Sequence, residues 1–327
     1  MSTYFALRYD FRAAGVTRVQ RQEMYARALE QAPYAEQHGF GAVMLSEHHA
    51  SDDGYLPSPI PAASAVAAVT STLPISISAL LANLYDPVRL AEDIAVLDHL
   101  SGGRVSYVFG LGYRPEEYAA FGRPWRTRGV DIEQQIRTLL ALWTGEATEV
   151  DGRRVQVRPV PFSDPHPVLF YGGGSEAAAR RAARLGLNFA PQHSDPELRA
   201  LYRRTCEELG RQPGFVMVPP PGPAAVFCSE DPDRFWAEYG GYLLADARGY
   251  AQWESAVASH VRDESATVEA LRAAGRYVVH TPDELIAQAQ AGDLKLVTAH
   301  AACGGLPAEP SWESLRLLCE KVKPAIG

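Results

Sequence analysis

The sequence contains few cysteines, and they lie far apart. Four occur among its 327 residues, with no Cys-x-x-Cys pair: Cys206, Cys228, Cys303 and Cys319. This spacing argues against a disulfide framework and against a structural zinc site, and it fits a reducing compartment.

Positive charge is also scarce. The 31 Lys and Arg residues are outnumbered by 39 Asp and Glu residues, so the formal net charge is −8. Broad binding to nucleic acid or to an anionic membrane requires a basic surface, so the sequence argues against both partners. A local basic pocket for one phosphate group remains compatible with this balance.

Long uninterrupted apolar runs are missing as well. The segment 60–84 is apolar, but Pro61 and Pro74 divide it into pieces too short to span a membrane. The first apolar run contains Arg8 and Asp10, which is unlike a signal peptide. The composition, 46% hydrophobic and 21% charged, is typical of a soluble globular enzyme. We therefore expect a cytoplasmic protein without a membrane segment.

Short apolar runs alternate with longer amphipathic segments, which predicts a parallel sheet with helices between its strands. The predicted strands are 4–9, 42–45, 75–81, 104–109, 168–171, 187–190 and 294–299, with 215–218 and 224–228 competing for the seventh place. The predicted helices are 19–38, 60–71, 87–101, 115–121, 129–143, 175–185, 196–209, 282–291 and 311–322. About eight strand–helix units favour a single TIM (β/α)8 barrel domain over 1–327, with an open doubly wound sheet as the alternative.

One strand–helix unit is complete within residues 86–112. Asp86 is placed to cap a helix that begins at Pro87, and Gly102 is placed to end it. The apolar face predicted for this helix consists of Val88, Ala91, Ile94, Ala95, Val96 and Leu97. The polar residues predicted mostly opposite are Arg89, Glu92, Asp93 and Asp98. The strand that follows leaves through glycines, so its backbone can approach another group closely.

Two segments are predicted to be insertions that decorate the barrel. Asp151-Gly152 between two short strands is a strong hairpin signal, which predicts a hairpin over about 147–158. The second insertion is the aromatic-rich stretch at about 232–265. Its aromatic residues could cover an apolar pocket, enter the core or form a subunit contact: Phe235, Trp236, Tyr239, Tyr242, Tyr250 and Trp253.

The active site of a (β/α)8 barrel gathers at the carboxyl ends of its strands. Glu47, His48 and His49 follow the second strand. Histidine moves protons near neutral pH, and Glu47 could orient it. The alternatives are a hydrogen-bonded loop histidine and a metal site that also includes Asp52 and Asp53. Neighbouring histidines at a strand exit point to opposite sides and rarely bind one ion, so we expect no metal.

A glycine turn separates the fifth strand from its helix. It comprises Gly172, Gly173 and Gly174, followed by Ser175. The free N–H groups and dipole of a helix N-terminus suit a phosphate, to which Ser175 could add its hydroxyl. The alternative is a tight turn with no ligand. The arginines that follow are expected to face solvent or acidic neighbours: Arg180, Arg181 and Arg184.

The fourth strand ends at Gly112, Tyr113 and Arg114. Glycine at 112 would allow a flat ring to lie against the backbone, and Arg114 could meet an anion. The alternative is a steric requirement of barrel packing. Other residues near strand ends are interpreted as structural or as pocket lining: His193, Cys228, His300 and Cys303.

Together these segments resemble the bacterial luciferase-like flavin-dependent monooxygenase family over nearly the whole chain. The pieces that carry the resemblance are GFGAVMLSEHH at 39–49, DPVRLAEDIAVLDHLSGGR at 86–104, EEYAAFG at 116–122, GGGSEAAARRAARLG at 172–186 and CGGLPAEPSWESLRLL at 303–318. Their order and spacing make the resemblance specific. It implies a TIM barrel with insertions that binds reduced FMN, or the deazaflavin F420, at the mouth formed by the strand ends.

The resemblance also assigns residues. His48 matches a histidine that assists proton transfer, and Ser78-Ala79 match a position that often has a non-proline cis peptide beneath the flavin ring. The residues that match positions beside the ring or around the phosphate are Gly112, Tyr113, Gly174 and Ser175. Two departures concern the phosphate: luciferases have an arginine at Tyr113 and a threonine at Ala178. Phosphate binding would then depend on backbone amides and Ser175, or on Arg114.

By this resemblance the chain is a flavin-dependent oxidoreductase, foremost a two-component monooxygenase. A separate NAD(P)H:flavin reductase would supply reduced FMN, and O2 would be used to oxygenate a small organic substrate, with His48 as acid or base. One alternative is an F420-dependent dehydrogenase or reductase that transfers hydride without oxygen. Others are a flavin-binding protein without turnover and, more distantly, a metal-dependent hydrolase. Family members commonly assemble, so a homodimer or higher homo-oligomer is expected.

Overall fold

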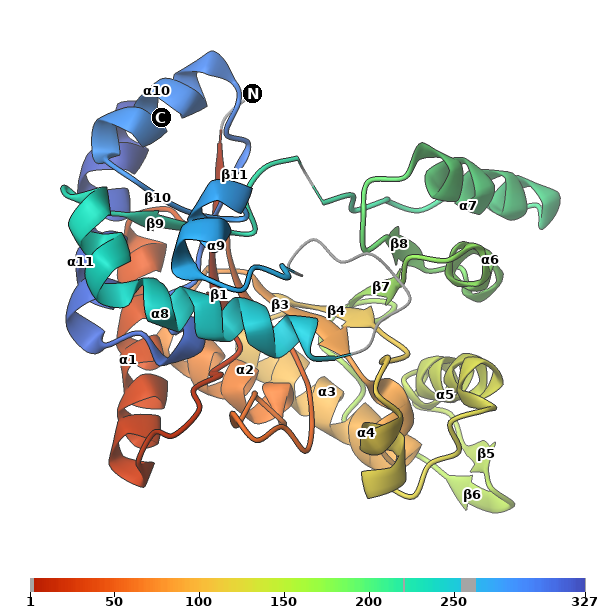
Figure 1. Ribbon diagram of the computed structural model, residues 1–327. Coiled ribbons are helices and arrows are strands. Elements are labelled where there is room, and N and C mark those ends of the chain that lie inside the picture. The colour runs from red at the N-terminus through yellow and green to blue at the C-terminus, as the bar shows by residue number, and fades with distance from the viewer. Residues whose placement is uncertain (1–2, 220, 254–262, 327) are drawn as a thin grey trace.

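A curved parallel sheet lies at the centre of the molecule, with helices along its outer side (Figure 1). The structure is a computed structural model that describes residues 3–219, 221–253 and 263–326. Seven strands pair in the order β11-β1-β2-β3-β4-β7-β8. Their bounds are β1 Tyr4–Tyr9, β2 Ala42–Leu45, β3 Ile75–Leu80, β4 Val105–Phe109, β7 Val168–Gly172, β8 Asn188–Ala190 and β11 Leu296–Ala299. Strands that pair with their sequence neighbours, the last lying beside the first, have the order of a (β/α)8 barrel.

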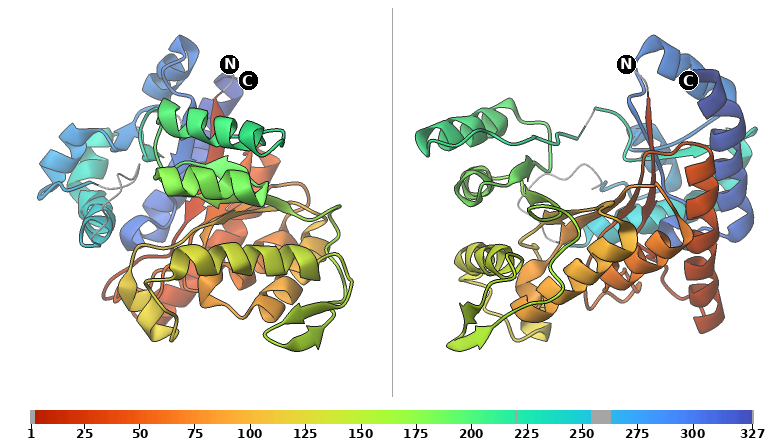
Figure 2. Two further views of the ribbon diagram at one scale, coloured as in Figure 1. Left: turned by 90° about the vertical axis from the view of Figure 1, so that its right-hand side faces the viewer. Right: turned by 180° about the vertical axis from the view of Figure 1, so that it is seen from behind.

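Helices alternate with these strands and follow the outside of the curve, as both views of Figure 2 show. The longer helices are α1 Arg18–Gln37, α2 Pro59–Val69, α3 Pro87–Ser101, α5 Arg128–Leu142, α6 Glu176–Leu185, α7 Pro196–Glu208, α10 Pro282–Ala291 and α11 Ala308–Leu317. Short helical segments are η1 Ala82–Leu84, α4 Pro115–Ala120, η2 Cys303–Gly305, the π-helix η3 Leu318–Val322 and α12 Lys323–Ile326. Strand residues such as Leu7, Ile77 and Phe109 are fully buried in the core. The alternation confirms the predicted α/β architecture with insertions.

A separate pair of strands occupies the region where the seventh barrel strand was expected. β9 (Ala225–Cys228) pairs in parallel with β10 (Tyr277–His280), and β9 packs against β11. The competing segment contributes a single bridge, between Val216 and Phe189 of β8. In the described ranges no ladder joins β8 to β9. β10 was not predicted, because only its two central valines are aliphatic and they give too short an apolar run to stand out.

The structure describes the predicted hairpin and part of the segment predicted to be the second insertion. β5 (Thr148–Val150) and β6 (Arg153–Val155) form the hairpin, and Asp151 and Gly152 adopt positive φ angles of 48° and 72°. Such angles are typical of the two-residue turns that match strand twist. The second insertion begins with α8 (Pro232–Ala251), and α9 (Val268–Ala274) follows it. Residues 254–262 of the predicted insertion lie outside the described residues.

The predicted ends of α3 are confirmed, whereas two of its residues, Val96 and Asp98, lie on other faces than predicted. The Asp86 carboxylate accepts the N–H groups of the first turn, and Gly102 ends the helix with a φ of 62°. Val96 is 48% exposed although it was assigned to the buried face. Asp98 is buried because its carboxylate accepts the Ser163 N–H at 2.7 Å. A carboxylate with such a partner can leave the solvent-facing side.

Two expectations from composition can be compared with the structure. In the part of the chain that is described, no helix has both the length and the apolar character needed to cross a membrane. All four cysteines are described, and each is a buried free thiol.

Candidate active site

His48 lies after β2, and both nitrogen atoms of its ring are close to polar groups. Nδ1 lies 2.8 Å from Glu117 Oε1, and Nε2 lies 3.1 Å from the hydroxyl oxygen of Tyr113. A carboxylate accepts hydrogen bonds, so Nδ1 carries the proton and Nε2 can accept the Tyr113 O–H. The His48 ring is buried, and its backbone N–H donates to the Leu56 carbonyl. The loop therefore holds this imidazole in one tautomer and one orientation.

Glu117 extends from the short helix α4 and is fully buried. Its Oε1 also accepts the backbone N–H of His49 at 2.9 Å. Its Oε2 accepts no hydrogen bond from any described residue and lies 3.6 Å from where a Cβ on Gly112 would be. An unsatisfied buried carboxylate oxygen is unfavourable. This atom therefore marks a position where a bound molecule can donate a hydrogen bond.

Of the two adjacent histidines, Glu47 bonds to His49. Glu47 Oε1 accepts the Nε2–H of His49 at 2.7 Å, and the Tyr85 hydroxyl donates to the same oxygen. The Leu81 N–H donates to Glu47 Oε2. Glu47 is thus placed to orient His49, whereas Glu117 has that position on His48. A catalytic role for Glu47 stays a prediction. Side chains alternate along an extended segment, which puts Glu47 with His49 and turns His48 to the other side.

Arg114 belongs to the same cluster, and the anion it meets there is the Glu117 carboxylate. Its guanidinium donates to the His49 carbonyl at 2.7 Å and lies 3.5 Å from Glu117 Oε1. Trp253 packs on this group: its ring centre lies 4.5 Å from the Arg114 guanidinium and 4.4 Å from the His48 ring centre. The guanidinium already has a carboxylate and an aromatic partner. These contacts place Arg114 with His48 and provide no support for a phosphate role.

The end of β3 has the backbone feature that the resemblance implied, a cis peptide bond between Ser78 and Ala79. A Cβ on Gly110 would lie 2.7 Å from the Ala79 Cβ, so packing requires glycine there. Gly112 has a φ of 70°, which favours glycine for its backbone conformation. The packing interpretation thus applies to Gly110, and a flat ring beside Gly112 stays a prediction.

The glycine turn lies between β7 and α6, as predicted. A Cβ on Gly172 would lie 2.8 Å from the Val108 side chain, and Gly173 has a φ of 146°. Ser175 caps α6, since its hydroxyl oxygen accepts the Ala178 N–H. Its hydroxyl proton and the first-turn N–H groups are the donors that this helix end can offer to an anion. The arginines that follow pair with acids, as expected: Arg180 with Glu176, and Arg181 and Arg184 with Glu133.

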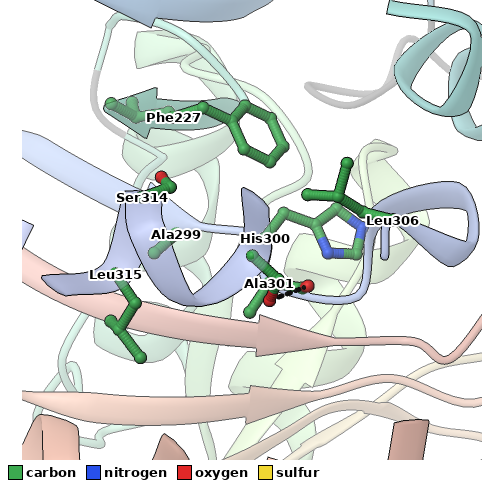
Figure 3. Close-up of a pocket in the computed structure, with 9 residues that line it drawn as sticks. Phe227, Ala299, His300, Ala301, Leu306, Ser314 and Leu315 are labelled. Carbon is green, nitrogen blue, oxygen red and sulfur yellow. Dashed lines mark hydrogen bonds between the residues drawn. The ribbon is translucent and has the colours of Figure 1, made fainter. Parts of the chain in front are cut away.

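A second buried group of charges surrounds His300, which follows β11. Its Nε2 lies 3.1 Å from Asp10 Oδ2 and 3.6 Å from Asp246 Oδ1. Figure 3 shows the imidazole near Phe227 and Leu306. Burial opposes the charged ring, but the two carboxylates outweigh burial and raise the pKa of His300 to about 9. His300 therefore carries a proton at neutral pH.

Two arginines complete the charge balance of this group. Arg8 donates to Asp10 at 3.2 Å, and Arg12 donates to Asp53 at 2.7 Å. The cations His300, Arg8 and Arg12 thus face the carboxylates Asp10, Asp53 and Asp246. The ligand atoms of Asp246, His300 and Cys303 lie within 4.8 Å of one another, a spacing that could hold a metal. Because the imidazolium already neutralises the carboxylates, we assign no metal to these residues.

A cleft of about 410 Å³ lies away from His48, beside α8, β10 and the start of α10. Trp236, Tyr277 and His280 are among its described lining residues, and none of the predicted site residues is. Three of the predicted residues, His48, Tyr113 and Arg114, lie instead against Trp253. The cleft is therefore not the candidate site.

Sequence reasoning missed Glu117, the residue that holds His48. A signal existed, since Glu117 lies in the EEYAAFG segment at 116–122 that contributed to the resemblance. His300 was interpreted as structural or pocket-lining, and its partners Asp10 and Asp246 were not considered. Asp10 follows β1, Asp246 belongs to α8 and His300 follows β11. His300 is 290 positions from Asp10 and 54 from Asp246, so only the folded chain brings the three together.

The family model described as luciferase-like monooxygenase matches residues 7–307. This match covers most of the chain, so the protein belongs to the luciferase-like monooxygenase family. Membership confirms the resemblance identified from the sequence motifs.

Two curated relatives match part of the chain. An uncharacterized protein of Mycobacterium tuberculosis is 33% identical over 177 residues, which are 47% of this chain and 63% of that protein. The FMNH2-dependent dimethylsulfone monooxygenase of Pseudomonas putida is 32% identical over 129 residues, 37% of this chain and 35% of that enzyme. The chain thus spans less than two thirds of the length of these relatives.

Solved structures match over the full length. Monooxygenase RslO1 from Streptomyces bottropensis has a TM-score of 0.76 at 23% identity, covering 99% of this chain and 100% of its own. An F420-dependent secondary alcohol dehydrogenase has a TM-score of 0.67 at 17% identity, covering 100% of both chains. At these identities the likeness establishes the fold, a luciferase-like TIM barrel. The named cofactors of the similar proteins include both FMN and F420.

Proposed function

We propose that this protein is the oxygenating component of a two-component flavin-dependent monooxygenase. It would use reduced FMN and O2 to oxygenate a small organic substrate, with a separate NAD(P)H:flavin reductase as partner. The observation that carries the proposal is His48, buried after β2 with Nδ1 on Glu117 and Nε2 toward Tyr113. A histidine held in this way can give or take a proton at Nε2.

The residues around His48 fit a reduced flavin by their hydrogen-bonding character. Glu117 Oε2 is a buried acceptor without a donor among the described residues, and a reduced flavin ring has N–H groups to donate. Ser78, Ala79, Gly112 and Tyr113 would hold the ring. The backbone of Gly172, Gly173 and Gly174, the Ser175 hydroxyl and the first turn of α6 would hold the phosphate.

The chain itself contributes orientation, proton transfer and exclusion of water. When bound, the flavin supplies the electrons and the reactivity toward O2. Glu117 keeps the His48 proton on Nδ1, and Tyr113 donates to Nε2. Trp253 and Tyr55 pack against the His48 ring and keep solvent away from it. Burial raises the pKa of Tyr113, so its hydroxyl stays protonated as a donor.

One observation favours a second candidate, an F420-dependent dehydrogenase or reductase. Arg114, the guanidinium next to Tyr113, is already bound to His49 and Glu117. The fourth-strand exit therefore offers weak support for an FMN phosphate. Hydride transfer without oxygen would use the same histidine as acid or base. A flavin-binding protein without turnover is the remaining alternative.

Anaerobic titration with reduced FMN and with F420 separates these candidates. We expect saturable binding of reduced FMN, followed by oxygen uptake when a reductase is added. Exclusive binding of F420 would favour the dehydrogenase, and binding without oxygen uptake would favour a passive binder. Binding of neither cofactor would contradict the whole proposal.

The role of His48 is tested by His48→Ala. We expect this variant to bind reduced FMN as wild type does and to lose turnover by about 10²-fold or more, because the proton donor or acceptor is removed. Turnover is measured as substrate-dependent oxygen uptake in the presence of the reductase. His38→Ala is the control, since His38 bonds only to its own helix among the described contacts. Unchanged turnover in His48→Ala would remove His48 from the mechanism.

We also propose that the protein is a homo-oligomer that works in the cytoplasm. The eleven residues of α2 contain no charged side chain, and Val69 at its end is 41% exposed. On the neighbouring α3, Val96 and Leu100 are also exposed. An apolar surface of this kind supports contact with a second copy. The four buried free thiols support a reducing location.

A further inference from the structure

A chain of hydrogen bonds leads from the buried His300 to the hydroxyl of Ser46. His300 Nε2 lies 3.1 Å from Asp10 Oδ2, and the Tyr250 hydroxyl donates to the same oxygen at 3.2 Å. The hydroxyl oxygens of Tyr250 and Tyr55 lie 2.8 Å apart, and Tyr55 donates to Ser46 Oγ at 2.7 Å. His300, Asp10, Tyr250 and Tyr55 are all buried, and Ser46 is half-buried.

We propose that this chain is a proton relay that stores a proton on His300 and releases it at Ser46, beside His48. The proposal rests on the proposed function, which requires protons at this mouth. Ser46 directly precedes Glu47 and His48, and the Tyr55 ring packs edge-on against the His48 ring with centroids 4.9 Å apart. The relay thus ends where the reacting groups are proposed to lie.

The transfer is balanced in atoms and charge. Ser46 gives its hydroxyl proton to the reacting group and takes the O–H proton of Tyr55. Tyr55 takes the proton of Tyr250, and Tyr250 takes a proton through Asp10 from His300 Nε2. One N–H bond breaks on His300, which changes from cation to neutral, and the reacting group gains one proton. No electrons move, and uptake of a solvent proton in the reverse direction restores His300.

The groups around His300 favour a stored proton. Asp10 after β1, Asp246 of α8 and the Cys303 thiol of η2 face it, with Arg8 and Arg12 beside the carboxylates. Tyr277 of β10 donates to Asp246 at 2.6 Å. The two carboxylates raise the pKa of His300 to about 9 against the effect of burial. The proton is therefore present at neutral pH and is held less firmly than that of a buried tyrosine.

The tyrosines are suited to pass a proton and not to keep a charge. Burial raises the pKa of Tyr55 to about 12, and it also raises the pKa of Tyr250. The Tyr55 hydroxyl has two oxygen neighbours, Ser46 and Tyr250, so its single proton can point in either direction. A link that only anchored α8 would need Arg8, Asp10 and Tyr250. The further hydrogen bonds from Tyr250 through Tyr55 to Ser46 are not needed to hold α8. They connect the charged group around His300 to the segment that contains His48.

The decisive variant is Tyr55→Phe, which removes one oxygen from the middle of the relay and keeps the ring that packs on His48. The rate at which His300 exchanges its proton with solvent is measured by ¹⁵N NMR of histidine-labelled protein near pH 9. We expect exchange at least tenfold slower in Tyr55→Phe, with an unchanged His300 titration midpoint. Tyr9→Phe is the matched control, because it removes another buried hydroxyl, one bonded to Gln31 outside the relay.

Ser46→Ala is the second variant, in case Tyr55→Phe does not fold. It interrupts the half-buried end of the relay, and we expect the same slower exchange. Unchanged exchange in either folded variant would overturn the proposal, and so would equal slowing in Tyr9→Phe. These measurements need no flavin. Failure to bind reduced FMN would overturn the proposed function separately, and a slowed exchange in the two variants would still support the relay.

Discussion

The hydrogen bond between His48 and Glu117 acts directly on the residue that is proposed to transfer protons. Glu117 Oε1 accepts from the His48 ring at 2.8 Å in a fully buried position. A carboxylate in this position selects the tautomer of the ring and fixes its orientation. Glu47, equally buried, serves His49, Tyr85 and Leu81 instead. Two nearby carboxylates thus have different roles because they extend from different segments: Glu117 reaches His48 from α4, and Glu47 bonds to His49 from the end of β2.

Glu117→Gln tests this division of roles. The amide keeps the size of the side chain but loses the charge that favours His48 with its proton on Nδ1. We expect a loss of turnover of about 10-fold to 100-fold, a shifted pH profile, and unchanged binding of reduced FMN. The measurements are kcat against pH and a fluorescence titration with reduced flavin. Glu47→Gln is the control, expected to leave the pH profile of turnover in place. An identical shift in both variants would contradict the separate roles.

Gly249 is a residue that α8 needs for its contact with Arg12. A Cβ at this position would lie 1.9 Å from Arg12 Nη2, and Arg12 is held by Asp53. We expect Gly249→Ala to lower the free energy of unfolding by about 1–3 kcal/mol, as overpacked sites do. Chemical denaturation measures the change.

Gly241 in the same helix provides the matched control. A Cβ there would meet nothing within 4 Å. We expect Gly241→Ala to raise the free energy of unfolding by about 0.5–1 kcal/mol, because alanine is the better helix former. Destabilisation of equal size by both variants would show that the effect of Gly249→Ala does not come from Arg12.

At the level of elements, α8 is the helix that joins the two charged groups. Asp246 pairs with His300, Tyr250 bonds to Asp10, and Trp253 just beyond the helix packs on His48. α8 thus connects the ends of β1 and β11 with the exit of β2. The docking of this helix depends on the charge of His300, because a neutral His300 would leave the three carboxylates Asp10, Asp53 and Asp246 against only two arginines.

The stability of this contact is expected to depend on pH. The pKa of His300 is about 9 in the folded protein against 6.5 for the free side chain. The stabilisation is fully present below about pH 6.5 and is lost as pH rises through about 9, on the order of 3 kcal/mol in total. Thermal unfolding between pH 6 and 10 measures it. We expect a fall in melting temperature over this range that is smaller in His300→Gln, and an equally steep fall in that variant would contradict the assignment.

On the scale of the whole molecule, we expect two copies of the chain to associate through the exposed apolar residues of α2 and α3. Val69, Val96 and Leu100 are 41%, 48% and 61% exposed, and the two helices pack side by side. The charge-free α2 offers nothing to repel a second copy. A symmetric contact through this surface would bury these residues.

Light scattering coupled to gel filtration tests the assembly. We expect wild type at twice the mass of one chain, and Leu100→Glu at the mass of one chain, because a charge would be buried in the contact. Val130→Glu is the control, because Val130 is 74% exposed and belongs to α5 and not to α2 or α3. A monomeric wild-type protein, or dissociation by Val130→Glu, would contradict a contact through α2 and α3.

Much of the fold could be predicted from local patterns. The caps of α3, the Asp151-Gly152 hairpin and most strands lie where the sequence indicated them, because capping, turn geometry and periodicity depend on a few neighbouring residues. β10 was missed because its four residues include only two aliphatic side chains, which is too short an apolar run to indicate a strand. Val96 and Asp98 were assigned to the wrong faces. Asp98 is buried because it bonds to Ser163, a residue distant in the sequence.

The sequence by itself determined the alternation of strands and helices, the family motifs and the location of His48 at a strand exit. These follow from residue types at fixed short spacings, which act through local geometry. Only the tertiary structure decided that Glu117 and not Glu47 holds His48, that Trp253 packs on its ring, and that His300 carries a proton between Asp10 and Asp246. Partners and pKa values depend on distances and burial between segments remote in the chain, and folding alone sets those distances.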